Sequence, residues 1–350
     1  MWNRRRWGAL CASGILSSAA MGAYAQGRWG ALPRVAPPKD AVRLVLAVHD
    51  KASFSMLPLT VAERLGYFAA EGVDVQVREF PDTLACVQSV ATGASQVLST
   101  GYATAVALRA RGTLPLTAFV QQGRTPQLVM GVADQMAHHS LKDARIGLSI
   151  TNTDAHRMAR LVLQRVGLKE GDVRFVPLRR HAQAVAAFRT GQVDAICYTD
   201  PTVTLLEQEG AIKVMADTRT VRGSSDVFGG PLPAACLAAP EAFLERQPAE
   251  AQALSFAMVR ALKWLQTAGP SDIIRVVPEV YFLGDRSVYL AAFSRVRESW
   301  TPDGLMPAAG PATFLKTVES LGDMPETRGL DMEKTYTNRF AQKAKARFRA

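Results

Sequence analysis

Between residues 42 and 215, short apolar segments rich in β-branched residues alternate with segments of helical spacing. Val42–Val48 predicts a buried strand, and Leu57–Ala70 predicts a helix that stops at Gly72. Further strands are predicted at Val73–Val77, Gln96–Ser99, Leu116–Gln121, Arg145–Ile150, Val173–Leu178, Ala195–Tyr198 and Ile212–Met215. The intervening helices are predicted at Thr83–Ala91, Ala103–Ala110, Asp154–Val166, Ala182–Thr190 and Val203–Gln208. Strands that alternate with helices need crossover connections, which favour an α/β fold with mainly parallel sheets.

Two segments of this region resemble each other. Thr92–Thr100 and Thr190–Tyr198 align without gaps, and each begins where a predicted helix ends at glycine. Each then runs through an apolar strand to a new helix start. The chain has 350 residues, enough for two domains of ordinary size. The echo suggests two similar α/β lobes, although any two strand–helix junctions share some of this pattern.

The sequence after about residue 240 is almost wholly helical. Its predicted helices are Glu241–Arg246, Ala249–Ala268, Asp285–Ser299 and Pro311–Leu321. We expect these helices to pack onto a lobe that the preceding strands have already formed.

The first 25 residues have the pattern of a cleaved signal peptide. Arg4–Arg6 form a positive start, an apolar run follows to Met21, and Ala23–Ala25 is a small-residue cleavage site. An uncleaved anchor helix is the alternative, but the apolar run is short for a membrane span. We therefore expect an exported, periplasmic protein, with the general secretory and twin-arginine routes both open. Residues 26–41 contain three prolines and predict an unstructured linker.

The formal net charge of +10 is concentrated at the two ends of the chain. Three arginines lie in the predicted signal peptide, and residues 334–350 carry six basic residues and no acidic one. The body between them is nearly neutral, which argues against a groove for nucleic acid. Residues 333–350 are expected to form a basic tail, either solvated or helical, with contact to acidic lipids or a permease as a minor alternative.

Neither a disulfide framework nor a cofactor site is indicated. Cys86, Cys197 and Cys236 remain after cleavage, an odd number, and each lies in an apolar context that predicts a buried, inert thiol. Motifs of hydrolases, phosphate-binding loops and zinc sites are absent from the sequence. The adjacent His138 and His139 have no acidic partner at ligand spacing, so we expect no metal and no cofactor.

Four strand–helix junctions are candidates for a ligand site, because ligands of open α/β sheets bind beyond the carboxyl ends of the strands. They are residues 49–56, 99–102, 149–156 and 198–201. Unpaired amides at helix N-termini bind oxyanions, and three of the junctions also carry an aromatic residue suited to a pocket wall. Ordinary helix capping is the alternative for each. The candidate ligand-binding residues are Phe54, Ser55, Met56, Thr100, Gly101, Tyr102, Gln121, Asn152, Thr153, His156, Tyr198 and Asp200.

Several charged side chains near these junctions have two interpretations. His156 either donates to an oxyanion or caps its helix, and Arg124 either clamps an acid or lies on the surface. Asp50, Asp154 and Asp200 either cap helices or bind an amine or a pyrimidine.

A series of short motifs resembles the periplasmic substrate-binding proteins of ABC importers for sulfonates, taurine, nitrate and thiamine-pyrimidine precursors. The resemblance runs from about residue 43 to residue 340, and its motifs occur in the family's order. They are residues 61–75 (VAERLGYFAAEGVDV), 91–93, 108–112, 140–147, 166–173, 191–195, 200–201 and 331–340. Two segments depart from the family pattern, namely Leu141–Ala144 and Asn152–His156. The second places a bulkier amide side chain beside the expected anion position.

The resemblance implies a two-lobed periplasmic binding fold of type II, with the ligand cleft between the lobes. Lobe 1 would comprise residues 42–124 and 229–332, and lobe 2 residues 125–228. The chain would cross between them near Gly123–Leu128 and Phe228–Gly230.

The implied function is that of a monomeric carrier, not an enzyme, that closes on a small organic anion, sulfonate-like or carboxylate, and delivers it to a membrane permease. The alternatives are a pyrimidine or other aromatic ligand of the thiamine-precursor type, an enzyme of small-metabolite processing on the same scaffold, and a module that binds a partner protein.

Overall fold

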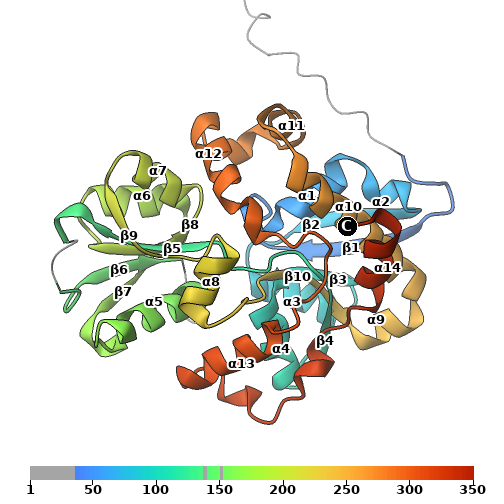
Figure 1. Cartoon of the computed structure of the whole chain (residues 1–350). Helices are drawn as coiled ribbons and strands as arrows, with labels where there is room; N and C mark the ends of the chain where they lie inside the picture. Colours follow the sequence, from blue (N-terminus) through green and yellow to red (C-terminus); the bar gives the residue numbers. More distant parts are fainter. Residues whose placement is uncertain (1–35, 137–139, 150–152) are drawn as a thin grey trace, which may run out of the picture. The chain divides into compact units, whose positions relative to one another are not determined.

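The computed structural model describes residues 36–136, 140–149 and 153–350. The predicted signal peptide and most of the predicted linker lie outside these residues, as do His138, His139 and Asn152. The described chain builds two mixed five-stranded sheets flanked by helices, which confirms the predicted α/β class (Figure 1).

The first sheet has the strand order β2-β1-β3-β10-β4. Its strands are β1 (Val42–Val48), β2 (Val73–Glu79), β3 (Val97–Gly101), β4 (Leu116–Gln121) and β10 (Ala235–Pro240). β1 runs parallel to β2 and β3, whereas β10 is antiparallel to both of its neighbours. All six residues of β4 are buried because helices cover both of its faces.

The second sheet repeats this plan with the order β7-β6-β8-β5-β9. Its strands are β5 (Leu128–Ala133), β6 (Arg145–Leu148), β7 (Arg174–Pro177), β8 (Ala195–Thr199) and β9 (Ile212–Asp217). Here β5 is the antiparallel strand. In each sheet the antiparallel strand is the first one after the chain crosses over, between β4 and β5 and again between β9 and β10. Both connections therefore link the two sheets directly.

Helices pack on the faces of each sheet. Around the first sheet lie α1 (Leu57–Arg64), α2 (Tyr67–Ala70), α3 (Thr83–Ala91), α4 (Tyr102–Ala110), α9 (Glu241–Arg246), α10 (Pro248–Thr267) and α14 (Arg339–Phe348). The second sheet carries α5 (Asp154–Arg165), α6 (His181–Arg189), α7 (Thr202–Gln208) and α8 (Val221–Phe228). The remaining helices are α11 (Pro270–Val276), α12 (Arg286–Val296) and α13 (Gly310–Ser320). In the described part of the chain, no helix combines the length and the apolar character needed to cross a membrane.

The structure corrects the sequence analysis at several elements. The predicted helix Leu57–Ala70 is divided because Gly66 adopts a left-handed conformation with φ 69°, and a 3₁₀ turn, η1 (Phe54–Met56), precedes it. The predicted strand Arg145–Ile150 ends at Leu148 as β6. Strands β5 and β10 and helices α8 and α11 were not predicted. Alanine-rich β10 has weak strand propensity and forms because a neighbour pairs with it on each side.

The predicted basic tail is helical and packs against the body of the protein. Phe340, Ala341 and Ala344 of α14 are buried, and α14 lies along α10. Lys345 and Arg347 form ion pairs with Asp303 and Glu71. Part of the positive charge at this end is therefore neutralised within the fold.

Candidate functional site

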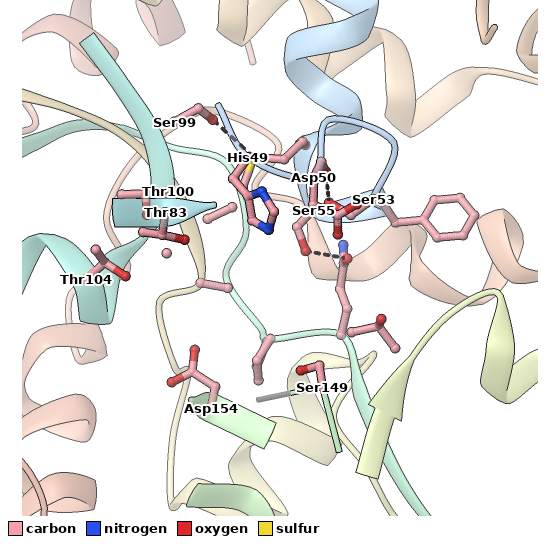
Figure 2. Close-up of a pocket in the computed structure, with 18 of the residues that line it drawn as sticks. His49, Asp50, Ser53, Ser55, Thr83, Ser99, Thr100, Thr104, Ser149 and Asp154 are labelled. Carbon is pink, nitrogen blue, oxygen red and sulfur yellow. Dashed lines mark hydrogen bonds between the residues drawn. The ribbon is translucent and has the colours of Figure 1, made fainter. Parts of the chain in front are cut away.

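A cavity of about 980 Å³ lies at the carboxyl ends of strands from both sheets. The first wall, which follows strands of the first sheet, comprises His49, Asp50, Ser53, Phe54, Ser55, Met56, Glu79, Thr83, Ser99, Thr100, Gly101 and Thr104. The second wall, which follows strands of the second sheet, comprises Ser149, Asp154, Arg179, Arg180, His181, Ala182, Tyr198, Thr199 and Asp200. Figure 2 shows labelled residues of both walls around the same space. This is the position at which open α/β sheets bind their ligands.

His49 presents a hydrogen-bond acceptor to the cavity when it is neutral. Its Nδ1 lies 3.1 Å from the carbonyl oxygen of Phe80, and a carbonyl only accepts, so Nδ1 carries the proton. Nε2 then keeps its lone pair, and Figure 2 shows the His49 ring directed into the cavity.

Asp50 follows His49 and adds a negative charge to the first wall. Its backbone is left-handed, with φ 53°, and its carbonyl oxygen accepts from the amide and hydroxyl of Ser53. The side chain is exposed, and among the described residues no hydrogen bond or ion pair engages its carboxylate. Asp50 is therefore available to a ligand.

The 3₁₀ turn η1 is held in place by contacts to distant parts of the chain. Ser55 Oγ donates to Gln127 Oε1 at 3.2 Å, and Gln127 Nε2 donates to Ser299 Oγ at 2.6 Å. The Phe54 ring lies 4.5 Å from that of Tyr289. Gln127 also lines the cavity and lies on the first crossing between the sheets with φ 57°. Sequence analysis missed Gln127 because its partners are distant in the chain.

Two predicted site residues of the first sheet face the core instead of the cavity. Tyr102 is fully buried, its hydroxyl lies 2.6 Å from Thr335 Oγ1, and its ring packs edge-on against Phe314. Gln121 Nε2 donates to the carbonyl oxygen of Gly123. Thr100 and Gly101, from the same junction, line the cavity.

The β7–α6 junction supplies cavity residues that sequence analysis missed. Arg179 and Arg180 are exposed, and neither takes part in an ion pair within the described chain. His181 Nδ1 lies 2.7 Å from Thr202 Oγ1. Burial lowers the pKa of His181, whereas the carboxylates of Asp50 and Asp200 oppose that shift. The signal was present in the sequence, since Leu178 ends a predicted strand and polar residues follow it.

Tyr198 and Asp200 line the second wall, but their polar groups are already engaged. Tyr198 Oη donates to the carbonyl oxygen of Leu178 at 2.8 Å, and burial, followed by the charge of Asp50, raises its pKa to about 12. Asp200 Oδ1 accepts from the amide of Thr204 at 2.9 Å, and Oδ2 lies 3.2 Å from Arg219. The structure thus favours the capping interpretation for Asp200, while the Tyr198 ring is buried and packs edge-on against His181.

The third predicted junction contributes less than expected. Asp154 lines the cavity with one carboxylate oxygen 3.0 Å from Arg157. His156 does not line it, because the ring is buried beside Glu170 Oε1 at 3.1 Å and edge-on to Phe175. Thr153 borders a neighbouring cavity of about 540 Å³. Arg124 also lies away from the cavity, with Nε donating to the carbonyl oxygen of Glu298.

The two walls differ in their unpaired charged side chains. Asp154 pairs with Arg157 and Asp200 with Arg219, although each arginine is shared with other carboxylates. The first wall keeps the carboxylates of Asp50 and Glu79, whereas the second wall keeps two exposed guanidinium groups. In the described part of the chain, no cluster of three His, Cys, Asp or Glu side chains has the geometry of a metal site. Cys86 also lines the cavity, but burial raises the pKa of its thiol to about 11, which keeps the thiol protonated at neutral pH.

Comparison with known proteins agrees with this architecture. A structure from Bordetella bronchiseptica RB50 is 37% identical, with a TM-score of 0.78 over 88% of this chain and 98% of that one. The periplasmic aliphatic sulphonate binding protein SsuA of Escherichia coli is 17% identical, with a TM-score of 0.67 over 84% of this chain and 97% of that one. The periplasmic nitrate-binding protein NrtA of Synechocystis PCC 6803 is 14% identical, with a TM-score of 0.69 over 88% and 89%, respectively.

The fold is therefore that of the periplasmic binding proteins, as predicted. The sequence model of the NMT1/THI5-like family matches residues 53–270. This range begins at the first wall of the cavity, includes the whole second sheet and ends after α10. The chain belongs to the NMT1/THI5-like family.

Proposed function

We propose that this protein is the substrate-binding component of an ABC importer, which captures a small solute in the cavity and delivers it to a membrane permease. The observation that carries the proposal is the cavity itself, because its two walls come from separate sheets joined by two crossings. Rotation about those crossings would close the walls on a ligand and exclude water. The lobes would be residues 42–124 with 229–332, and residues 125–228.

The proposed ligand is a small organic acid that also carries a hydrogen-bond donor. Arg179 and Arg180 suit an oxyanion such as a sulfonate or carboxylate, and the N-terminus of α6 begins beside them. Asp50 and the Nε2 atom of His49 suit a donor on the opposite side. Binding of sulphonate and of nitrate by the structural relatives is consistent with an anion.

An aminopyrimidine of the thiamine-precursor type is the second candidate. The aromatic residues Phe54 and Tyr198 are among those that line the cavity, and Asp50 offers a carboxylate that pairs well with an amino-substituted ring. This candidate would use the same cavity but would depend little on the two arginines of the second wall.

Thermal unfolding of the mature chain, residues 26–350, tests the proposal. The panel contains small sulfonates, carboxylates, amino acids and aminopyrimidines. A true ligand at a hundred times its Kd stabilises the folded state by about 2.7 kcal/mol. No stabilisation by any compound, together with no small molecule in the mass spectrum of the purified protein, would contradict the proposal. Catalytic turnover of a bound compound would instead support an enzyme.

We also propose that residues 1–25 direct export to the periplasm and are then removed. The charged start, the short apolar run and the small-residue site support this assignment. Periplasmic fractions should contain a chain that begins at residue 26, and N-terminal sequencing measures this directly. A chain that retains Met1 and stays with the membrane fraction would indicate an anchor.

A further inference from the structure

Two contacts join the proposed lobes in addition to the crossings between the sheets. We call the lobe of residues 125–228 the second lobe and the other the first lobe. At the α5 contact, helix α5 of the second lobe meets residues 321–324 of the first. At the α12 contact, α12 and η5 (Arg297–Ser299) of the first lobe meet α7 and the start of α8. The two contacts differ in burial, in charge pairing and in the core around them.

A single buried guanidinium lies at the centre of the α5 contact. The Arg157 side chain is only 3% exposed. Its Nε donates to Asp323 Oδ2 at 2.7 Å, and its Nη1 donates to Asp154 Oδ1 at 3.0 Å. Asp154 belongs to the second wall of the cavity, whereas Asp323 belongs to the first lobe. Arg157 therefore ties a residue of the cavity wall to the lobe on the other side.

Further contacts fix the segment that receives this guanidinium. Arg160 of α5 donates from Nη2 to the carbonyl oxygen of Leu321 at 2.7 Å, and Arg111 of α4 pairs with Glu326 at 2.7 Å. Met324 of the same segment is buried and has a left-handed backbone with φ 48°. A strained conformation of this kind persists only where the surrounding structure holds it. The segment is thus bound to a helix of each lobe.

The hydrophobic core is continuous across the α5 contact. One cluster of buried side chains contains Met158 and Val162 of α5 together with Tyr102 and Phe314 of the first lobe. The buried apolar residues of α6 and α7 belong to a separate cluster drawn from residues 129–212, all within the second lobe. Separating α5 from the first lobe would therefore open a packed core, whereas moving α6 and α7 would not.

The helices of these two clusters lie on opposite faces of the second sheet. Successive side chains of a strand point to opposite faces. In β8, Cys197 belongs to the cluster that includes α5, and its neighbour Ile196 belongs to the cluster of α6 and α7. Because displacement grows with distance from the axis of rotation, a rotation that leaves α5 in place moves α6 and α7. It carries with them Arg179 and Arg180, which directly precede α6.

The α12 contact is held less firmly. Arg295 forms an ion pair with Glu207, and the arginine side chain is 40% exposed. The amide of Val221 donates to Glu298 Oε1 at 3.0 Å. Exposed ion pairs contribute little to stability because water and salt screen them. A depression of about 370 Å³ is lined by α6 and α7 and also by η4 (Glu279–Phe282) and α12, which leaves room for these elements to approach each other.

We propose that the second lobe pivots about the α5 contact, and that Arg157 is the positioning residue that holds Asp154 of the cavity wall at this pivot. When the cavity closes, α6 and α7 move towards α12 and bring Arg179 and Arg180 over the solute. This inference rests on the proposed function, because it takes closure as the means of capture, and it adds the side on which the cavity closes. The alternative is a rotation that changes both contacts equally.

Double electron–electron resonance of the free chain, residues 26–350, tests the pivot with two pairs of spin labels. One pair, at Gln164→Cys and Lys316→Cys, spans the α5 contact, and the other, at Ala186→Cys and Val280→Cys, spans the α12 contact. All four positions are exposed, whereas the native cysteines are buried and escape labelling. We expect one narrow distance across the α5 contact and a broader distribution, extending to shorter distances, across the α12 contact. Equal breadth, or a broader distribution across the α5 contact, would overturn the inference.

Asp323→Asn tests the role of Arg157, because it removes the charge of one carboxylate partner and keeps the size of the side chain. It should broaden the distances across the α5 contact and leave those across the α12 contact unchanged. Glu319→Gln, at an exposed acid of α13, is the matched control. Unchanged α5 distances in Asp323→Asn would show that Arg157 does not hold the pivot.

Arg295→Gln changes an exposed ion pair and decides the question if Asp323→Asn does not fold. It should broaden only the distances across the α12 contact, and broadening across the α5 contact would contradict the pivot. These measurements need no solute, so failure of every compound in the thermal screen would contradict the proposed function alone. Binding of a compound without any change in the α12 distances would instead refute the pivot and leave binding intact.

Discussion

The two walls of the cavity differ in how some of their polar side chains are held. On the first wall, Ser55 is tied through Gln127 to Ser299, and Ser99 Oγ donates to Met56 Sδ at 3.1 Å. On the second wall, Arg179 and Arg180 are exposed and have no ion-pair partner in the described chain. Side chains that are already held lose little freedom on binding, whereas exposed and unpaired side chains such as Arg179 and Arg180 lose rotamer freedom when they bind an anion. A solute bound between the walls would therefore order these arginines more than it orders Ser55 or Ser99.

The largest expected effect comes from removing the positive charge of the second wall. Arg179→Ala with Arg180→Ala should weaken an acidic ligand roughly tenfold to a hundredfold, since a hydrogen bond to a charged group contributes about 1.5–3 kcal/mol. Titration calorimetry measures the loss. Arg174→Ala, at an exposed arginine of β7 outside the cavity, is the matched control. Equal affinity of the double variant and the control would show that the arginines do not hold the solute.

The next effect comes from the negative charge of Asp50 on the first wall. Its removal should raise or lower the affinity, depending on the charge of the ligand. Asp50→Asn keeps a residue that tolerates φ 53° and removes one negative charge. It should weaken an amino-sulfonate about tenfold and strengthen the same sulfonate without its amine, because Asp50 attracts the amine and repels the anion. Competition binding of the two probes measures this reversal.

The same variant has a spectroscopic consequence. Asp50 raises the pKa of His181 against the dominant effect of burial, so Asp50→Asn should lower that pKa further. An NMR titration of the His181 ring checks the direction. An unchanged pKa of His181 would mean that Asp50 does not face His181 across the cavity.

Sequence reasoning was most successful where a pattern is local. The limits of β1, α3 and β4 follow from apolar periodicity and from the residues that end each segment. It failed at alanine-rich β10, whose pairing partners lie more than 100 residues earlier in the chain. Such a strand is specified by the sheet around it.

For the site residues, too, local sequence patterns were informative and distant contacts could not be foreseen. Position at the end of a strand pointed to Thr100 and Tyr198, and both line the cavity. It did not reveal where a side chain points, and Tyr102 turns into the core because Thr335, 233 residues later, supplies a buried partner. The arginines of the β7–α6 junction were overlooked although they occupy an equivalent position to the junctions that were named.

A variant that breaks the link from Ser55 through Gln127 to Ser299 should lower the free energy of unfolding more than it changes which ligand binds. Gln127→Asn keeps tolerance of the left-handed backbone but shortens the side chain, so Ser55 and Ser299 lose their shared partner. We expect a loss of about 1–3 kcal/mol in the free energy of unfolding, measured in urea. Gln208→Asn, at an exposed position of α7, is the control and should change little.

The smallest expected effect is on the pH dependence of stability, through His156, which lies outside the cavity. Burial lowers the pKa of His156 below its ordinary value of 6.5, so the folded state resists a proton that the unfolded state accepts. Stability should therefore be greatest above pH 6.5 and decline as the pH falls towards the lowered pKa. His156→Gln should reduce this decline between pH 7.5 and 5.5 and leave ligand affinity unchanged. A large loss of ligand affinity in this variant would indicate that His156 takes part in binding.

The most direct test is a crystal structure of residues 26–350 with the compound that most stabilises them in the thermal screen. We expect density for that compound between the walls, with an acidic group near Arg179 and Arg180 and a donor near His49 and Asp50. A ligand bound outside the cavity would contradict capture by closure of the two walls. So would a ligand that contacts one wall while the other wall stays apart from the ligand.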